Sequence, residues 1–93
     1  MDRTVLEVKV QRIYKINNNG FLKAFVDISV NNALLIKSVR ILNGKNGLFV
    51  SMPQEKAKDQ KWYDSVVALD KETKMAVGRV VLEAYEQIAE QQQ

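Results

Sequence analysis

The residues with the clearest chemical potential are five basic side chains around the expected start of a C-terminal helix. Lys71, Lys74 and Arg79 lie on or beside this helix, and Lys56 and Lys58 lie in the loop before it. Ammonium and guanidinium groups that face one way form a patch for phosphates, and each neutralised phosphate makes binding more sensitive to salt. These residues are therefore candidates for nucleic-acid contacts.

Acidic and aromatic neighbours leave the role of these basic residues open. Asp70 and Glu72 lie among them, and lysines on loops and helix edges are commonly just solvated. Trp62 and Tyr63 lie next to Lys61 and could stack a base, as in single-strand binders. We expect instead that Trp62 anchors the core and Tyr63 covers an edge, because a large aromatic ring supplies much of the burial in a small domain. From the residues alone, phosphate binding and an ordinary solvated surface are equally compatible with the sequence.

Groups that could support catalysis are scarce in this chain. Histidine and cysteine are absent, so the commonest general base, the thiol nucleophile and the usual transition-metal ligands are missing. Ser51 and Ser65 lack a histidine to activate them. Asp64 and Asp70 flank an expected strand that would hold them about 20 Å apart, too far to act on one bond. We therefore expect no enzyme, no cofactor, no metal site and no small-molecule substrate.

Length and composition are typical of one small domain. The 93 residues are expected to form a single domain over 1–93, with 90–93 as a frayed tail. No apolar run approaches the ~20 residues of a membrane span, residues 1–4 lack the apolar core of a signal peptide, and the absence of cysteine fits a reducing compartment. We therefore expect a cytoplasmic protein with no membrane partner.

Residues 1–79 carry a charge balance of +6 and residues 80–93 one of −3, which is compatible with an anionic partner such as nucleic acid.

Five stretches with strand character precede one helix. The expected strands cover residues 5–14, 21–30, 33–42, 48–52 and 62–69, with a bulge near 11–12 and turns at 17–20, 31–32 and 43–47. Pro53 ends the fourth strand because proline cannot donate to a ladder, and residues 54–61 are expected to form a mobile surface loop. The fold class is therefore α+β: an antiparallel meander of about five strands followed by one C-terminal amphipathic helix.

The helix is expected to begin near Lys71, after a cap at Asp70 or, alternatively, at Thr73. Its apolar positions recur at helical spacing and form one stripe: Val77, Val80, Val81, Ala84, Tyr85 and Ile88. Gly78 inside the helix costs roughly 1 kcal/mol relative to alanine, unless close packing requires it.

Apolar side chains on both faces of the expected sheet predict that it is covered on more than one side. One face of the second strand carries Leu22, Ala24, Val26, Ile28 and Val30. The third strand alternates Leu35, Val39 and Ile41 with Leu34, Ile36 and Arg40. A sheet with one helix leaves a face or an edge uncovered, and a two-fold homodimer is the simplest way to cover it. We assign Phe25, Leu34, Ile36 and Phe49 to the core or to this interface; alternatively, the helix and the long loop bury everything within one chain.

Residues 39–53 resemble the hallmark of the SpoVG family, the stage V sporulation protein G or putative septation proteins of bacteria. The matching features are the strand Val39-Arg40-Ile41, an Asn/Gly turn and Gly47-Leu48-Phe49-Val50-x-Met52-Pro53. Asp64 and Leu82-Glu83-Ala84-Tyr85-Glu86 also match in position. The chain differs at Val67-Ala68, where the family commonly has His-Pro, and at Gln54-Glu55-Lys56, where basic residues often follow Met-Pro. It therefore resembles a divergent member.

The resemblance implies a small cytosolic homodimer with a β-sheet and a C-terminal helix. It also implies binding of DNA and possibly RNA, gene regulation, and control of septation and sporulation. Together with the basic residues, it predicts a nucleic-acid-binding regulator, with phosphate contacts first at Lys71, Lys74 and Arg79 and then at Lys56 and Lys58. The alternative is a protein-interaction module in septation control, acting through a sheet edge or the acidic helix end without direct nucleic-acid binding.

Overall fold

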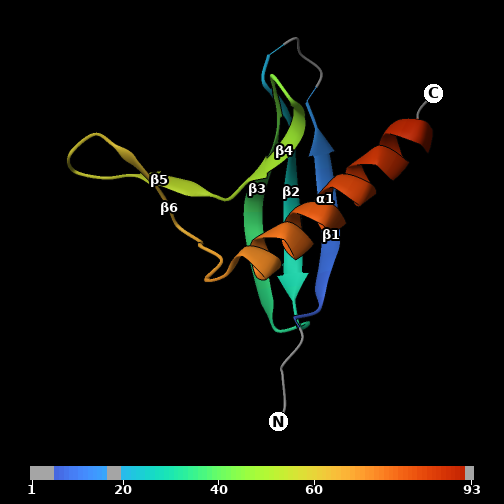
Figure 1. Cartoon of the computed structure of the whole chain (residues 1–93), viewed down its shortest axis with the longest axis horizontal. Helices are drawn as coiled ribbons and strands as arrows, with labels where there is room; N and C mark the ends of the chain where they lie inside the picture. The colour runs from blue at the N-terminus through green and yellow to red at the C-terminus, as the bar shows by residue number, and fades with distance from the viewer. Residues whose placement is uncertain (1–5, 17–19, 92–93) are drawn as a thin grey trace.

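The protein folds as a four-stranded antiparallel sheet crossed by one long helix (Figure 1). The computed structural model describes residues 6–16 and 20–91, with side chains up to residue 88. The main sheet has the order β1-β2-β3-β4, with β1 at Val8–Lys15, β2 at Leu22–Val30, β3 at Leu34–Gly44 and β4 at Gly47–Ser51. β5 (Gln54–Lys56) and β6 (Trp62–Asp64) form a separate two-stranded sheet, and α1 spans Lys71–Gln91. The α+β class and the antiparallel meander are confirmed, with four strands in the meander.

The core lies between the main sheet and α1. Its buried side chains are Ala24, Val26, Ile28, Val39 and Ile41 from the sheet and Val77 and Val81 from α1. The alternation in β2 predicted its buried face, and the helical spacing predicted Val77, Val81 and the partly buried Tyr85. Leu82, which lies outside the predicted stripe, also packs against the core.

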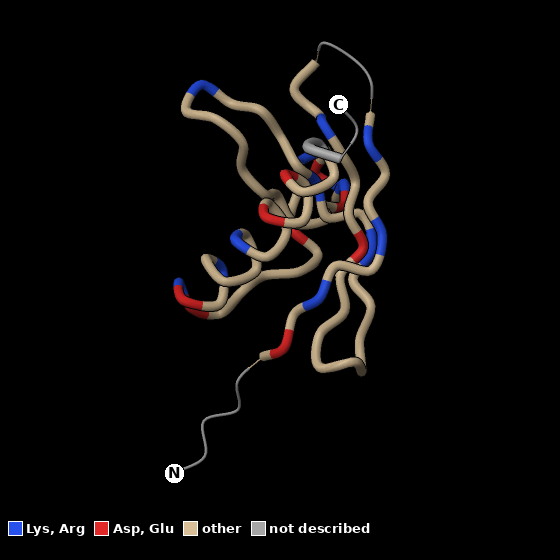
Figure 2. The backbone as a smooth tube through the Cα atoms, turned by 90° about the vertical axis from the view of Figure 1, so that its right-hand side faces the viewer, with Lys and Arg blue, Asp and Glu red and all other residues tan. Residues whose placement is uncertain are grey.

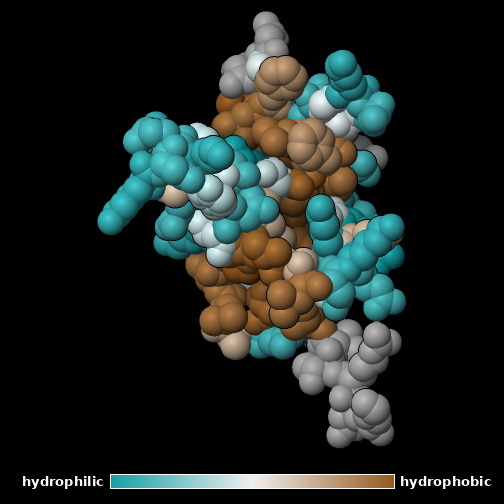
Figure 3. Space-filling model, turned by 60° about the vertical axis from the view of Figure 1, so that its left-hand side comes forward, coloured by the Kyte–Doolittle hydropathy of each residue, from teal (hydrophilic) through white to brown (hydrophobic). Residues whose placement is uncertain are grey.

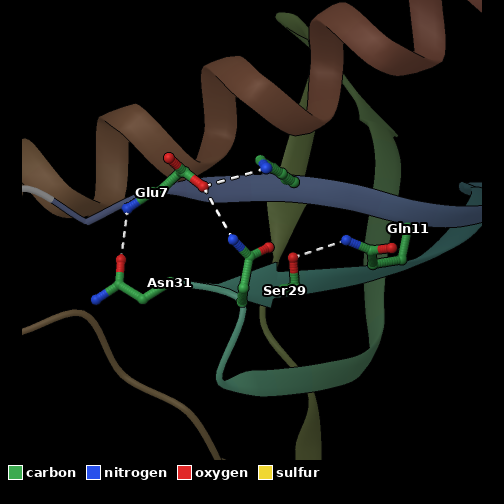
Figure 4. A network of polar contacts seen from close by, with 6 residues as sticks. Glu7, Gln11, Ser29 and Asn31 are labelled. Carbon is green, nitrogen blue, oxygen red and sulfur yellow. Dashed lines mark hydrogen bonds and ion pairs between the residues drawn. The ribbon is translucent and has the colours of Figure 1, made fainter.

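The turn between β2 and β3 is attached to the start of β1 by a polar network (Figure 4). Asn31 and Asn32 both have φ of 53°, as in the tight turn that the sequence predicted. The Glu7 backbone N–H donates to the Asn31 side-chain oxygen at 2.7 Å, and the Asn31 N–H donates back to the Glu7 carbonyl at 2.8 Å. Nearby, the Gln11 amide donates to the Ser29 hydroxyl at 2.7 Å. These contacts hold β1 in register with β2, before the strand begins and at the bulge itself, which was predicted near residues 11–12 and is observed there.

A bulge in β3 decides which of its side chains face the helix. Ser38 has φ of 66°, and its N–H donates to the carboxylate of the buried Asp27 at 3.2 Å. The resulting register shift places Ile36 opposite Ile28 on the core side and turns Leu35 to the other face. The faces predicted for Leu35 and Ile36 are therefore wrong, because a bulge reverses strand alternation.

The chain leaves the main sheet after β4 and forms a hairpin, β5–β6, that projects to the side (Figure 1). Pro53 has no N–H to continue the ladder, and its carbonyl accepts the Ser65 N–H at 2.7 Å. The predicted mobile loop over 54–61 is thus largely a hairpin, and the predicted fifth strand over 62–69 is reduced to Trp62–Asp64. Trp62 is 61% exposed, so its expected role as a core anchor is wrong. The hairpin carries it away from the space between sheet and helix.

The start of α1 confirms Asp70 as the helix cap. Its carboxylate accepts the Thr73 N–H at 2.7 Å, and its carbonyl accepts the Lys74 N–H at 3.2 Å. At the other end, α1 extends to Gln91. The predicted strand start at residue 5, the turn residues 17–19 and the tail residues 92–93 lie outside the described residues.

Candidate nucleic-acid interface

Three of the five predicted phosphate contacts lie together in a groove between β4 and α1, here called the β4–α1 groove. Lys71, Lys74 and Arg79 line it from α1, and Lys71 and Lys74, three residues apart, are neighbours on the helix surface. The groove encloses about 890 Å³, and β4 with the residues after it forms the other wall. All three basic side chains are exposed and therefore available to a phosphate backbone.

The β4–α1 groove is positively charged. Among the residues that line it, Asp64 is the acidic one, and its carboxylate accepts a hydrogen bond from the Gln54 amide at 2.8 Å. Figure 2 shows basic positions along the N-terminal half of α1, with the acidic Glu72 in its first turn, and further acidic positions along the rest of the helix. The arrangement can therefore hold an anion near the start of α1.

Hydrophobic side chains make the floor of this groove. They are Leu48, Val50, Met52, Val77 and Leu82. Phe49 and Met75 also line it and remain 48% and 65% exposed. Figure 3 shows hydrophobic surface above and below the hydrophilic hairpin. A Cβ on Gly78 would meet no atom within 4 Å, so close packing among the described residues does not require a glycine there.

The other two predicted contacts, Lys56 and Lys58, do not line the β4–α1 groove. Both are exposed on the β5–β6 hairpin, Lys56 in β5 and Lys58 in the turn that follows. The Asp59 carboxylate orders this turn by accepting the Lys61 N–H at 3.0 Å and the Tyr63 hydroxyl at 2.6 Å. The hydroxyl contact lowers the pKa of Asp59 and raises the pKa of Tyr63.

A second candidate surface is the sheet face opposite α1, here called the open face. No helix covers it in the part of the chain that the structure describes. Cross-strand neighbours Tyr14, Phe25, Arg40 and Ser51 form a row across all four strands of this face. Residues directly opposite each other in antiparallel strands point to the same side, so aromatic and basic groups meet here. Sequence reasoning placed Phe25 on this side but missed Tyr14 and Arg40 as its neighbours.

The hairpin adds Trp62 to the open face. Trp62, Phe25 and Arg40 line one small hollow of about 170 Å³. The Arg40 guanidinium donates to the Ser51 hydroxyl at 3.0 Å and to the Gln54 side-chain oxygen at 3.1 Å. Because Gln54 also donates to Asp64 in β6, these contacts join the hairpin to the sheet. The sequence signals for this surface were Phe25 on the outer side of its strand and Trp62 next to Lys61, although Trp62 was assigned to the core.

The four residues assigned to the core or a dimer interface fall in different places. Ile36 packs against the core. Phe25 is half-buried on the open face, whereas Leu34 and Phe49 are 66% and 48% exposed. Leu34 and Phe49 therefore remain available to a partner.

Two further properties concern the described ranges alone. Their His, Cys, Asp and Glu side chains include no group of three that could hold a metal ion. Their helical residues include no segment long and apolar enough to cross a bilayer.

Comparison with known proteins identifies the family. The SpoVG family model matches residues 4–87, which include both candidate surfaces. A putative septation protein SpoVG of Caldicellulosiruptor bescii is 34% identical over 83 residues, covering 89% of this chain and 94% of the relative. Proteins of the same name from Archaeoglobus fulgidus and Bdellovibrio bacteriovorus are 33% and 37% identical, covering 87% and 88% of this chain and 95% and 72% of their own. The chain therefore belongs to the SpoVG family.

Proposed function

We propose that the chain is a cytoplasmic, non-enzymatic regulator that binds nucleic acid and acts as a homodimer in septation and in the control of sporulation genes. The names of its relatives support the septation role. The observation that carries nucleic-acid binding is the grouping of Lys71, Lys74 and Arg79 in one groove.

The chemistry of the groove favours a phosphate backbone over a neutral ligand. Three exposed cations face one carboxylate, Asp64, which already accepts a hydrogen bond. The hydrophobic floor keeps water away from one side of these charges, and a cleft of one charge sign with apolar walls concentrates anions. Lysine is a flexible point charge, which suits phosphates more than base edges. We therefore expect contacts that depend on salt and little on sequence.

Anisotropy titrations of a short fluorescent DNA duplex over a salt series test this function. Lys71→Ala/Lys74→Ala is expected to weaken binding and to reduce the slope of log K against log salt by roughly 0.9 for each lost phosphate contact. Lys45→Ala/Lys61→Ala removes the same charge from exposed sites outside the groove and is the matched control. Undetectable binding at low salt, or equal losses in the two variants, would contradict the proposal.

The homodimer is proposed to form along β4. Among the described strands, β4 pairs with β3 alone, so its outer edge is available to a second β4 related by a two-fold axis. Phe49 lies on β4 at this edge and is 48% exposed. Sedimentation velocity should show a dimer that Phe49→Asp shifts to monomer, whereas Leu34→Asp, at the far end of β3, leaves it intact. A dimer unaffected by Phe49→Asp would place the interface elsewhere.

A protein-interaction module in septation control is the second candidate. The same edge of β4 suits an extended peptide, which would add a strand to the sheet. Glu83 and Glu86 give the later part of α1 an acidic surface. Co-purification of a partner that survives nuclease treatment, together with no binding to any nucleic-acid probe, would favour this function.

A further inference from the structure

We propose that the open face is a second binding surface, selective for single-stranded nucleic acid, on which unpaired bases stack on Tyr14, Phe25 and Trp62 while Arg12 and Arg40 contact phosphates. The inference rests on the proposed nucleic-acid function. It concerns a different face of the sheet, different residues and a different form of the ligand from those of the β4–α1 groove.

The aromatic side chains are placed for stacking. Tyr14 is directly opposite Phe25, and Phe25 shares a hollow with Trp62. Tyr14 and Trp62 are 48% and 61% exposed, so much of each ring is accessible. Bases of a single strand stack on such rings with little regard to sequence, because every base has a π-face.

The arginines of this face are oriented by hydrogen bonds rather than free in solvent. Arg40 is held by Ser51 and Gln54, and Arg12 donates to the Tyr14 hydroxyl at 3.3 Å. That contact with Tyr14 raises the pKa of Arg12. A guanidinium fixed beside an aromatic ring can pair with a phosphate or stack on a base.

A polar hollow of about 710 Å³ extends the surface beyond Tyr14. Gln11, Ser29 and Lys37 line it together with Arg12 and Asp27. Asp27 is only 9% exposed, and its carboxylate accepts the Ser38 N–H, so the accessible charge of the hollow is positive. The amide of Gln11 and the hydroxyl of Ser29 are polar groups of the kind that read base edges.

The occupant follows from this combination of rings and cations. In a duplex the flat faces of the bases are covered by stacking, so rings on a sheet are accessible only to unpaired bases. A second copy of the chain covering this face would bury exposed cations such as Arg12 and Lys37, and burying charges without partners is costly. A single-stranded polyanion satisfies both the rings and the cations.

Tryptophan fluorescence provides a direct readout, because Trp62 is the only tryptophan in the chain. The probe is oligothymidylate of about 12 nucleotides, within the range of site sizes known for single-strand binders. We expect saturable quenching on addition of this probe and none with a duplex of the same length. Tyr14→Ala and Phe25→Leu should weaken the quenching titration roughly 5- to 100-fold, the range for loss of one base stack.

Anisotropy titrations with the same two probes complete the test. They also allow Trp62→Ala to be measured, because this variant has no tryptophan to follow. Phe21→Ala is the matched control, since Phe21 is 76% exposed but lies before β2, outside the row of stacking residues. The affinity for the duplex should be unchanged in all four variants: Tyr14→Ala, Phe25→Leu, Trp62→Ala and Phe21→Ala. Circular dichroism should confirm that each variant is folded.

Three outcomes would overturn the proposal. Duplex binding without oligothymidylate binding removes the open face and leaves the β4–α1 groove as the site. Oligothymidylate binding that is lost in Lys71→Ala/Lys74→Ala but unchanged in Tyr14→Ala and Trp62→Ala has the same meaning. Binding of neither probe at low salt contradicts the nucleic-acid function itself.

Discussion

The β4–α1 groove and the open face are both basic, yet they hold their charges differently. In the groove, Lys71 and Lys74 extend from one helix above a hydrophobic floor. On the open face, Arg12 and Arg40 lie among aromatic rings and donate hydrogen bonds to neighbouring side chains. Flexible ammonium groups tolerate many phosphate positions, whereas a guanidinium held in place selects a geometry. We therefore propose the groove for a regular phosphate backbone and the open face for exposed bases.

The largest expected effect is a change in preference between the two forms of nucleic acid. Tyr14→Ala/Trp62→Ala should reduce the ratio of single-strand to duplex affinity roughly 100-fold, because two stacking contacts are lost. Lys71→Ala/Lys74→Ala should raise this ratio, because it weakens duplex binding more. Anisotropy titrations with both probes at one salt concentration measure the ratio. If both variants change the two affinities in proportion, the two regions act as one surface.

A smaller effect is expected from Arg40→Lys, which keeps the charge but loses the guanidinium Nη2 that donates to both Ser51 and Gln54. Loss of these bonds should lower the free energy of unfolding by about 1 kcal/mol and weaken oligothymidylate binding several-fold. Hydrogen exchange at the β5–β6 amides should also accelerate, since Arg40 joins the hairpin to the sheet. Arg79→Lys is the matched control in the groove, where a point charge is sufficient. Unchanged exchange in Arg40→Lys would show that the hairpin is positioned by other contacts.

The smallest effect concerns the hairpin turn and leaves both surfaces intact. The Tyr63 hydroxyl contact lowers the pKa of Asp59 from its ordinary value of 3.8. The contribution of Asp59 to folding stability is therefore present above pH 3.8 and is lost as pH falls through the lowered pKa. The same contact raises the pKa of Tyr63 above 10.0, so the contribution of Tyr63 to folding stability is present below pH 10 and is lost as pH rises beyond it.

Tyr63→Phe tests this contact. The pKa of Asp59, followed by NMR of its carboxyl carbon, should rise toward the ordinary value, although the Lys61 N–H keeps part of the shift. The ratio of single-strand to duplex affinity should stay constant. A changed ratio would bring Tyr63 into the binding surface.

The predictable parts of the fold are those decided by local patterns. The alternation of β2 identified Ala24, Val26 and Ile28 as core because this part of the strand has one polar side and one apolar side. Asp70 was identifiable as a cap because its side chain is bonded within the first turn of the helix that it starts. Both signals depend on residues only a few positions apart.

The errors arose where distant residues decide the structure. The bulge at Ser38 depends on the carboxylate of Asp27, eleven residues away, and it reverses the faces of Leu35 and Ile36. The β5–β6 hairpin has few apolar residues to indicate its strands, and contacts such as Arg40 to Gln54 join it to the sheet. The position of Trp62 was predicted wrongly for the same reason, because no local sequence pattern indicates the direction in which the hairpin leaves the sheet.

The candidate sites also combine features that the local sequence determines with features that only the tertiary structure determines. The three-residue spacing of Lys71 and Lys74 makes them neighbours on a helix, and residues 39–53 carry the resemblance to the SpoVG family, so sequence alone determined both. Only the tertiary structure placed β4 opposite those residues and Tyr14 beside Phe25. Helix crossing and strand register depend on packing and bulges between distant segments, whereas helical periodicity is a property of the local chain.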